Sequence, residues 1–359
     1  KFIEALEGEL VKISGHEIHL LVVDGNSPDG TAEIVRQKAK RYPNVHLYLE
    51  KEKAGLGAAY RYGMTKAIED LGAEVIFEMD ADFQHDPADV GRLLQAIDNG
   101  ADVAIGSRFV EGGSIPREWA FKRKFFSIFG NIFARAVLGM WKVHDLTTGF
   151  RASKTEVLKK IDFKKFFPKG YAYKVQLIHE LYFAGAKITE VPINFAEREE
   201  GESKMVGGAR IVPEEAVNEL KVVLALRWER SQRFIKFALV GGLGLLLQTI
   251  VFELFRGRIG PDNAAAVGGE LAIISNFIWN NLWTFRDRAL TRRRILPKFL
   301  QFNLTSLVAI AIQWLVIHAG VALWGPGLWI ERLYFAVSLV LVIIWNYTIY
   351  NKLIWRKKQ

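Results

Sequence analysis

The last third of the chain contains four apolar stretches of about twenty residues each, at residues 234–255, 263–285, 299–323 and 333–354. A helix of that length crosses the hydrocarbon core of a bilayer. Four such runs in succession, rich in Trp and Phe near their ends, are not typical of buried helices in a soluble protein. The sequence therefore predicts an all-α transmembrane domain of four spans at residues 233–359. A linker helix in the membrane interface is expected at residues 211–232.

Basic residues cluster in three of the five segments that flank these spans. They are Arg227, Arg230, Arg233 and Lys236 before the first span, Arg286, Arg288, Arg292, Arg293, Arg294 and Lys298 between the second and third, and Lys352, Arg356, Lys357 and Lys358 after the fourth. Because positive charge concentrates on the cytoplasmic side, we expect both termini and the N-terminal region to be cytoplasmic. The formal charge of +9 suits anionic lipid or phosphate ligands, and no motif favours a nucleic acid.

Strand-like and helix-like segments alternate ahead of the membrane part. "IHLLVVDG", "VHLYLE", "AEVIFEMD" and "ADVAIGSRF" are typical of strands, and helical patterns separate them. This order predicts a parallel sheet covered by helices, with ligands beyond the carboxyl ends of the strands, where Asp24 and Asp80 lie. The opening "KFIEALEGEL" resembles the middle or end of a helix, so further residues are expected ahead of Lys1.

The segment "EMDADFQHDP" holds two aspartates two residues apart and a glutamine two further on. In an extended strand Asp80, Asp82 and Gln84 would point to the same face. Two carboxylates that close repel each other unless a cation or a raised pKa resolves the conflict, and hard divalent cations prefer oxygen ligands. Mg²⁺ or Mn²⁺ is therefore one interpretation of the pattern. Taken alone, the pattern more often indicates a strand end followed by a polar turn with solvated carboxylates, because short acidic patterns recur by accident.

The glycines of "KAGLGAAYRYG" do not complete a dinucleotide-binding fingerprint, because the third glycine of that pattern is missing. Gly55 and Gly57 are interpreted instead as allowing a tight helix start. A hydrolytic glycosidase is disfavoured because its two carboxylates flank the scissile bond several ångströms apart.

Several motifs together resemble a known family. "VVDGNSPDGTAEIV", "GLGAAYRYGM", "EMDADFQHDP", "AIGSRFVEGG", "DLTTGFRA", "PKGYAY" and "EREEGESKM" occur in the order and at about the spacing seen in family 2 glycosyltransferases of the GT-A fold. Within that family the chain is most similar to polyprenyl-phosphate sugar transferases of the dolichol-phosphate mannose synthase type. The resemblance implies an α/β GT-A catalytic domain at residues 1–210. The motifs "RFIKFALVGGLG" and "ISNFIWNNLWTF" resemble the GtrA-like four-helix membrane family.

The resemblance implies that a sugar moves from a nucleotide diphosphate to dolichyl or another polyprenyl phosphate at the cytoplasmic membrane face. GDP-mannose is the favoured donor and UDP-glucose the alternative. By this resemblance the metal residues are Asp80, Asp82 and Gln84, and the catalytic residues Asp82 and Arg108. The implied donor residues are Asp24, Gly25, Asp80, Ala81, Asp82, Arg108 and Lys169, and the implied acceptor-phosphate residues are Arg198, Ser203 and Lys204. The acceptor is already an anion, so no strong base is required, and a single displacement with inversion is expected.

Two departures from the family concern nucleotide recognition. Nothing ahead of "IHLLVVDG" matches the family's Pro-x-x-Asn-Glu segment, and Gly25 stands where a second aspartate is usual. Other function classes fit less well. A channel or lipid flippase leaves the ordered motifs unexplained, and a processive polysaccharide synthase would carry Gln-x-x-Arg-Trp, whereas "ALRWERSQR" lacks that glutamine. Residues 118–142, basic at one end and rich in Phe, suit a helix lying in the membrane interface.

Overall fold

The computed structural model describes residues 1–50, 55–166, 172–197, 214–325 and 327–356. The chain divides into two compact units, Lys1–Arg227 and Trp228–Gln359. The boundary lies inside one long helix, α8 (Glu214–Ile259), whose first turns belong to the N-terminal unit.

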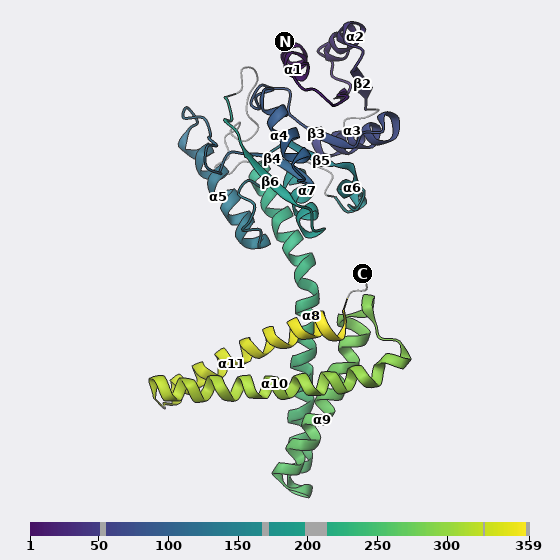
Figure 1. Cartoon of the computed structure of the whole chain (residues 1–359). Coiled ribbons are helices and arrows are strands. Elements are labelled where there is room, and N and C mark those ends of the chain that lie inside the picture. The colour runs from purple at the N-terminus through teal and green to yellow at the C-terminus, as the bar shows by residue number, and fades with distance from the viewer. Residues whose placement is uncertain (51–54, 167–171, 198–213, 326, 357–359) are drawn as a thin grey trace. The chain divides into compact units, whose positions relative to one another are not determined.

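The N-terminal unit is built from alternating helices and strands (Figure 1). In chain order they are α1 (Phe2–Leu10), β1 (Leu20–Asp24), α2 (Thr31–Arg41), β2 (Val45–Leu49), α3 (Leu56–Leu71), β3 (Val75–Glu78), α4 (Asp89–Asp98), β4 (Val103–Ser107), α5 (Phe121–Leu138), β5 (Arg151–Lys154), α6 (Thr155–Leu158), η1 (Phe163–Lys165), α7 (Ala172–Phe183) and β6 (Ile188–Pro192). The strands expected from the sequence correspond to β1, β2, β3 and β4.

The strands form two sheets. β1 and β2 make a parallel pair, while the larger sheet has the order β3-β5-β4-β6. β4 and β6 are parallel, but β5 lies between β3 and β4 and is antiparallel to both. The prediction of one parallel sheet was therefore wrong, although β3 and β4 do run in the same direction. The four residues of β5, Arg-Ala-Ser-Lys, show none of the apolar periodicity from which a strand can be recognised.

Two apolar clusters hold this unit together. One joins β3 and β4 to α3, α5, α7 and the first turns of α8, where Val222, Val223 and Leu226 are buried. The other packs α1 and α4 against β4 and β5. All five residues of β4 are buried, as expected for a strand with a neighbour on each side and helices on both faces.

The C-terminal unit is helical. After α8 it contains α9 (Pro261–Trp279), the π-helical turn Asn280–Thr284, the short helix Arg286–Arg288, α10 (Arg292–Trp324), α11 (Leu328–Ile349) and a second π-helical turn, Tyr350–Ile354. Three helices in the described residues are long and apolar enough to cross a membrane, Ala216–Ile259, Arg292–Trp324 and Trp329–Ile354. The predicted second span corresponds to α9, which is not among these three helices because its hydropathy is too low. The count of four spans therefore stays a prediction.

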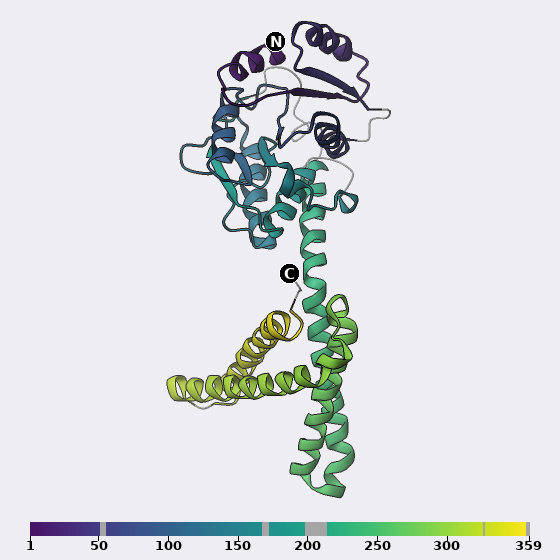
Figure 2. The ribbon, with the colours of Figure 1, turned by 45° about the vertical axis from the view of Figure 1, so that its right-hand side comes forward.

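Close contacts at glycines fix the pairing of these helices. α8 and α9 run side by side, and α10 and α11 form a hairpin (Figure 2). A Cβ on Gly268 of α9 would lie 2.9 Å from the carbonyl oxygen of Gln248 on α8, and one on Gly320 of α10 would lie 2.6 Å from the ring of Tyr334 on α11. Small residues at such crossings let membrane helices approach closely. Glu253 pairs with Arg256 at 2.8 Å and is exposed, so it does not face the helix bundle.

Candidate active site

The aspartates of "EMDADFQHDP" lie in a loop and not in a strand. β3 ends at Glu78, and Phe83 has a φ of 58°, a left-handed conformation that interrupts any extended alternation. Oδ1 of Asp82 accepts the backbone N–H of Gln84 at 3.1 Å, which closes a tight turn. The expectation that Asp80, Asp82 and Gln84 share one face of a strand was therefore wrong.

Asp80 of this loop forms an ion pair with a lysine of α7. Its Oδ2 lies 2.8 Å from Nζ of Lys174 on α7, and its Oδ1 accepts the hydroxyl of Tyr60 on α3 at 2.7 Å. Burial alone would raise the pKa of Asp80. The charge and hydrogen bond of Lys174 outweigh that effect and lower the pKa to about 2. Asp80 is therefore ionised at neutral pH, with both of its oxygens already engaged.

Gly149 makes room for this ion pair. A Cβ built on Gly149 would overlap Nζ of Lys174, lie 2.7 Å from its Cε and lie 3.3 Å from Oδ2 of Asp80. The glycine of "DLTTGFRA" is thus required because the side chain of Lys174 passes directly over it. Lys174 itself is buried, with a side chain 5% exposed.

A second buried ion pair joins β5 to β3, close enough to Lys174 for its charge to act on Glu78. Nε of Arg151 on β5 donates to Oε2 of Glu78 on β3 at 2.8 Å, and both side chains are almost fully buried. Tyr173 of α7 stacks on Tyr60, with ring centroids 5.7 Å apart and planes 4° apart. Charged and aromatic side chains from β3, β5, α3 and α7 therefore lie close to Asp80.

Arg108, expected to bind the donor and to act in catalysis, is held by Asp145 of "DLTTGF". Nε and Nη2 of Arg108 donate to the two carboxylate oxygens of Asp145 at 2.7 and 2.8 Å, and Nη2 also donates to Thr147. Burial would raise the pKa of Asp145, but Arg108 outweighs it and lowers that pKa. The backbone N–H of Asp145 is in turn bound by Oε1 of Glu190 on β6. The guanidinium is therefore rigidly positioned, and its donor role stays a prediction.

Gln84 and His85 close the loop against the segment that follows β6. The side-chain amide of Gln84 donates to the carbonyl of Ala196, whose own N–H donates back to the carbonyl of Gln84. His85 is 2% exposed and packs between Phe150 and Phe195. Burial lowers the pKa of His85 to about 3, although the charge of Asp80 opposes the shift. His85 is thus a neutral, buried anchor of the loop.

Asp24 ends β1 as expected. It is buried, and its Oδ2 accepts the N–H of Ser27 at 3.0 Å. In this turn the positive φ, 57°, falls on Asn26 and not on Gly25. Ala81 is exposed. Lys169, Arg198, Ser203 and Lys204 lie outside the described residues.

The side chains of this loop are of the chemical type that binds a hard divalent cation. Asp80, Asp82 and Gln84 offer carboxylate and amide oxygens, the ligands that Mg²⁺ and Mn²⁺ prefer. No cluster of three or more His, Asp or Glu side chains that could hold a metal ion occurs among the described residues. The metal role of Asp80, Asp82 and Gln84 therefore stays a prediction that rests on the chemical type of their side chains.

Comparison with known proteins now identifies the family. The profile of glycosyl transferase family 2 matches residues 2–162, and that of the GtrA/DPMS transmembrane domain matches residues 236–355. A dolichol-phosphate mannosyltransferase of Pyrococcus furiosus is 32% identical over 318 residues, 86% of this chain and 85% of that protein. This chain belongs to glycosyl transferase family 2. It is a membrane glycosyltransferase of the GT-A fold class with a GtrA-like transmembrane domain, as the sequence motifs predicted.

Two further relatives have higher identity over shorter matches. A polyprenol monophosphomannose synthase of Mycolicibacterium smegmatis is 45% identical over 192 residues, 53% of this chain and 71% of that protein. An undecaprenyl-phosphate mannosyltransferase of Micrococcus luteus is 43% identical over 213 residues, 59% of this chain and 85% of that protein.

Sequence reasoning missed three side chains of this candidate site, Tyr60, Lys174 and His85. A signal existed for Lys174, because a lysine inside the otherwise apolar "AYKVQLIHELYF" of α7 indicates a buried charge in need of a partner. The partner could not be read from the sequence, since Asp80 lies 94 residues earlier.

One helix of the N-terminal unit has an exposed apolar surface. On α5, Phe121, Phe125 and Phe129 are 83%, 47% and 54% exposed, and Ile128 and Ile132 beside them are also exposed. Phe125 and Phe129 stack with planes 6° apart. We call these five residues the α5 stripe. Its opposite side is anchored, because the amide of buried Asn131 binds the backbone of His144 and Leu146.

Proposed function

We propose that this glycosyltransferase moves mannose from GDP-mannose to the phosphate of dolichol or another polyprenol, with Mg²⁺ or Mn²⁺ bound. The observation that carries the proposal is that all three relatives above are named as mannosyltransferases or mannose synthases of a polyprenol or dolichol phosphate. The Asp80 loop supplies the oxygen ligands for a cation, and such a cation would bind the diphosphate of the donor.

A bound cation would neutralise negative charge on the departing nucleoside diphosphate. Asp82 and Gln84 are the side chains proposed to hold it, together with Asp80. Lys174 and Tyr60 keep the Asp80 carboxylate ionised and oriented before any donor arrives, because each binds one of its oxygens. A carboxylate that is fixed in advance needs little reorganisation when the donor binds.

The acceptor is proposed to approach from the membrane. The α5 stripe offers aromatic side chains that suit the boundary between lipid headgroups and tails. Because a lipid phosphate is already an anion, it can attack the anomeric carbon without a strong general base. A single displacement is proposed, which inverts an α-linked donor to a β-linked product.

The test is a competition between two donors. The assay contains purified protein, Mn²⁺, a polyprenyl phosphate and two donors, ¹³C-labelled GDP-mannose and unlabelled UDP-glucose. The mass of the glycolipid product is then determined by mass spectrometry. The proposal expects lipid that carries the ¹³C label. Unlabelled hexose on the lipid would establish the UDP-glucose alternative, and absence of any glycolipid would contradict the proposed reaction.

A further inference from the structure

Phe195, which follows β6, contacts three other parts of the candidate site. The guanidinium carbon of Arg108 lies 5.2 Å from the centre of the Phe195 ring. The ring of His85 lies 5.0 Å from it and the ring of Trp119 lies 5.7 Å from it, and both meet it edge to face. Arg108 follows β4, His85 belongs to the loop after β3, and Trp119 precedes α5. One partly buried ring thus connects three segments that lie far apart in the sequence.

Hydrogen bonds hold the backbone at Phe195. Its N–H donates to the carbonyl of Ser114 at 3.1 Å, and the N–H of Ala196 donates to the carbonyl of Gln84 at 3.0 Å. The N–H of Ser114 in turn donates to the carbonyl of Ile193 at 3.0 Å. The ring therefore starts from a backbone that is tied to two neighbouring segments.

Trp119 limits the movement of the Phe195 ring. Trp119 is 6% exposed, and the guanidinium carbon of Arg123 in the first turn of α5 lies 3.7 Å from the centre of its ring. Because protein interiors are close-packed, the Phe195 ring cannot turn toward Trp119 without displacing it.

The Phe195 ring contacts Arg108 where little water is present. The side chains of Arg108 and Asp145 are 8% and 0% exposed. Asp145 accepts hydrogen bonds from Nε and Nη2, along one edge of the guanidinium. Such a pair of bonds can still act as a hinge about which the guanidinium plane tilts. An aromatic ring attracts a cation held near its face, most strongly where both are shielded from water, so the Phe195 ring opposes that tilt.

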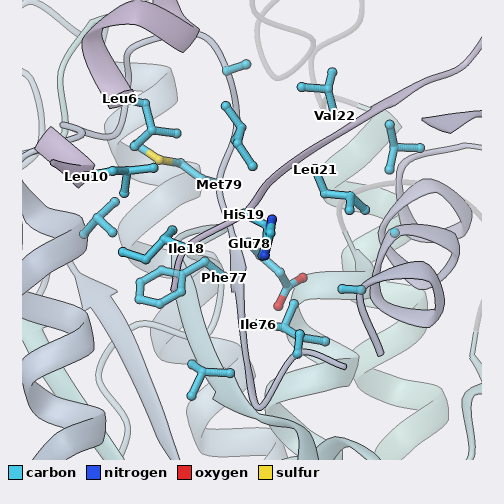
Figure 3. Close-up of a pocket in the computed structure, with 18 of the residues that line it drawn as sticks. Leu6, Leu10, Ile18, His19, Leu21, Val22, Ile76, Phe77, Glu78 and Met79 are labelled. Atoms are coloured by element: carbon cyan, nitrogen blue, oxygen red, sulfur yellow. The ribbon is translucent and has the colours of Figure 1, made fainter. Parts of the chain in front are cut away.

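His85 is the buried end of the Asp80 loop. Figure 3 shows Glu78, the last residue of β3, and Met79, which leads into this loop. The chain turns at Phe83, and His85 beyond the turn is 2% exposed. A change that frees His85 would therefore loosen the loop that carries Asp80.

Two ion pairs of the site are close to His85. The charges of Asp80 and Lys174 act on the pKa of His85, and so do the charges of Arg108 and Asp145. Electrostatic effects of this kind weaken with distance. The Asp80–Lys174 pair and the Arg108–Asp145 pair therefore lie within reach of one histidine.

We propose that Phe195 is a positioning residue that keeps the Arg108 guanidinium and the Asp80 loop in a fixed arrangement relative to each other. It acts through Arg108 and His85 and does not itself have to touch the donor. The inference rests on the proposed function and on the predicted donor role of Arg108. A misplacement of about 1 Å in such a site can lower a reaction rate roughly a hundredfold.

The first test compares Phe195→Leu with Phe133→Leu in residues 1–359 in detergent. Each change removes a partly buried ring from the N-terminal unit, and Phe133 packs against the apolar cluster of α3, α5 and α7. Thermal unfolding measures the loss of stability, and calorimetry with Mn²⁺ measures the binding of GDP and UDP. Sugar transfer from GDP-mannose and from UDP-glucose to a polyprenyl phosphate gives kcat.

Phe195→Leu should lower kcat between about ten- and a hundredfold and weaken nucleotide binding, although it destabilises the protein about as much as Phe133→Leu does. Phe133→Leu should keep the kcat and the nucleotide binding of the unchanged protein. Equal kcat and Kd in the two variants would overturn the proposal. If the unchanged protein transfers sugar from neither donor, the proposed function has failed, and nucleotide binding then decides whether Phe195 positions the site.

The second test asks whether Phe195 acts through Arg108. Arg108→Lys keeps the positive charge but loses the planar guanidinium. Phe195→Leu should therefore lower kcat by a factor that is at least about threefold smaller in the Arg108→Lys protein than in the unchanged one. An equal factor in both would mean that the ring only supports packing, and it would contradict the proposal. If Arg108→Lys does not fold, the comparison with Phe133→Leu still decides the question.

Discussion

At the residue scale, Asp82 is the side chain on which the proposed metal site most depends. Asp82→Ala should leave the fold intact and reduce transfer at least a hundredfold, roughly the effect of removing a charge-stabilising group from an active site. Asp86→Ala is the control, because Asp86 is exposed in the same loop. Transfer rates with Mn²⁺ and with excess chelator provide the measurement. Undiminished transfer in chelator would exclude the metal.

Gly149 allows a sharp test of the Lys174–Asp80 pair. Gly149→Ala should displace the lysine, destabilise the protein by about 1–3 kcal/mol as overpacking does, and lower the transfer rate. Adding Lys174→Met should relieve part of that loss, because the overlapping ammonium is gone, so the two changes should be less than additive in thermal unfolding. Gly8→Ala is the control, since a Cβ there meets nothing within 4 Å. Strict additivity would refute the overlap.

Asp145 links stability to pH. Its folded-state pKa is below the ordinary value, so its contribution is complete above a pH of about 4 and is lost as the pH falls through the lower folded value. Asp145→Asn should remove that acid-range loss. It should also cost roughly 3–5 kcal/mol at neutral pH, because the Arg108 guanidinium stays buried without its counter-charge.

Chemical unfolding from pH 2 to 7 measures both effects of Asp145→Asn. The exposed Asp98→Asn is the matched control. An unchanged acid profile in Asp145→Asn would contradict the assignment.

Groups of residues that are close together in the sequence could be predicted, whereas contacts between distant residues could not. Asp80 and Asp82 were recognised because their spacing is short, although the turn at Phe83 changed how they are presented. Lys174 and Gly149 were not recognised as partners of Asp80, because contacts between residues far apart in the chain leave no periodic signal.

At the element scale, α8 is anchored in the catalytic unit by its first turns. Leu226 is 1% exposed, whereas Leu224 on the same helix is 50% exposed. Leu226→Ala should therefore destabilise the N-terminal unit by about 2–5 kcal/mol, while Leu224→Ala should have a small effect. Thermal unfolding of the two variants measures the difference. Equal losses would mean that this segment of α8 does not pack as described.

The elements differ in how well the sequence predicts them. β1 to β4 and their helices follow from long apolar runs, and the membrane helices follow from length and hydropathy. β5 could not be predicted, because its register with β3 and β4 is set by long-range pairing and by the buried ion pair of Arg151 with Glu78. α9 has the length of a span but lower hydropathy than the three helices that could cross a membrane, so its apolar pattern predicts a span less clearly.

At the scale of the whole molecule, the charge distribution predicts the orientation in the membrane. The chain has no cysteine, so single cysteines are clean reporters. Asp262→Cys, at the exposed start of α9, should react with an impermeant thiol reagent from outside intact cells. Thr291→Cys, at the exposed start of α10, should react only after the membrane is opened. Labelling in the reverse pattern would place the catalytic unit on the non-cytoplasmic side.

The central claim is that a polyprenyl phosphate attacks the sugar of GDP-mannose in a single displacement. The most direct test is to isolate the glycolipid formed by the purified protein and to determine its anomeric configuration by NMR. The account predicts a β-mannosyl phosphate from the α-linked donor, with no sugar left on the protein. An α-linked product, or mannose trapped covalently on the chain, would contradict it.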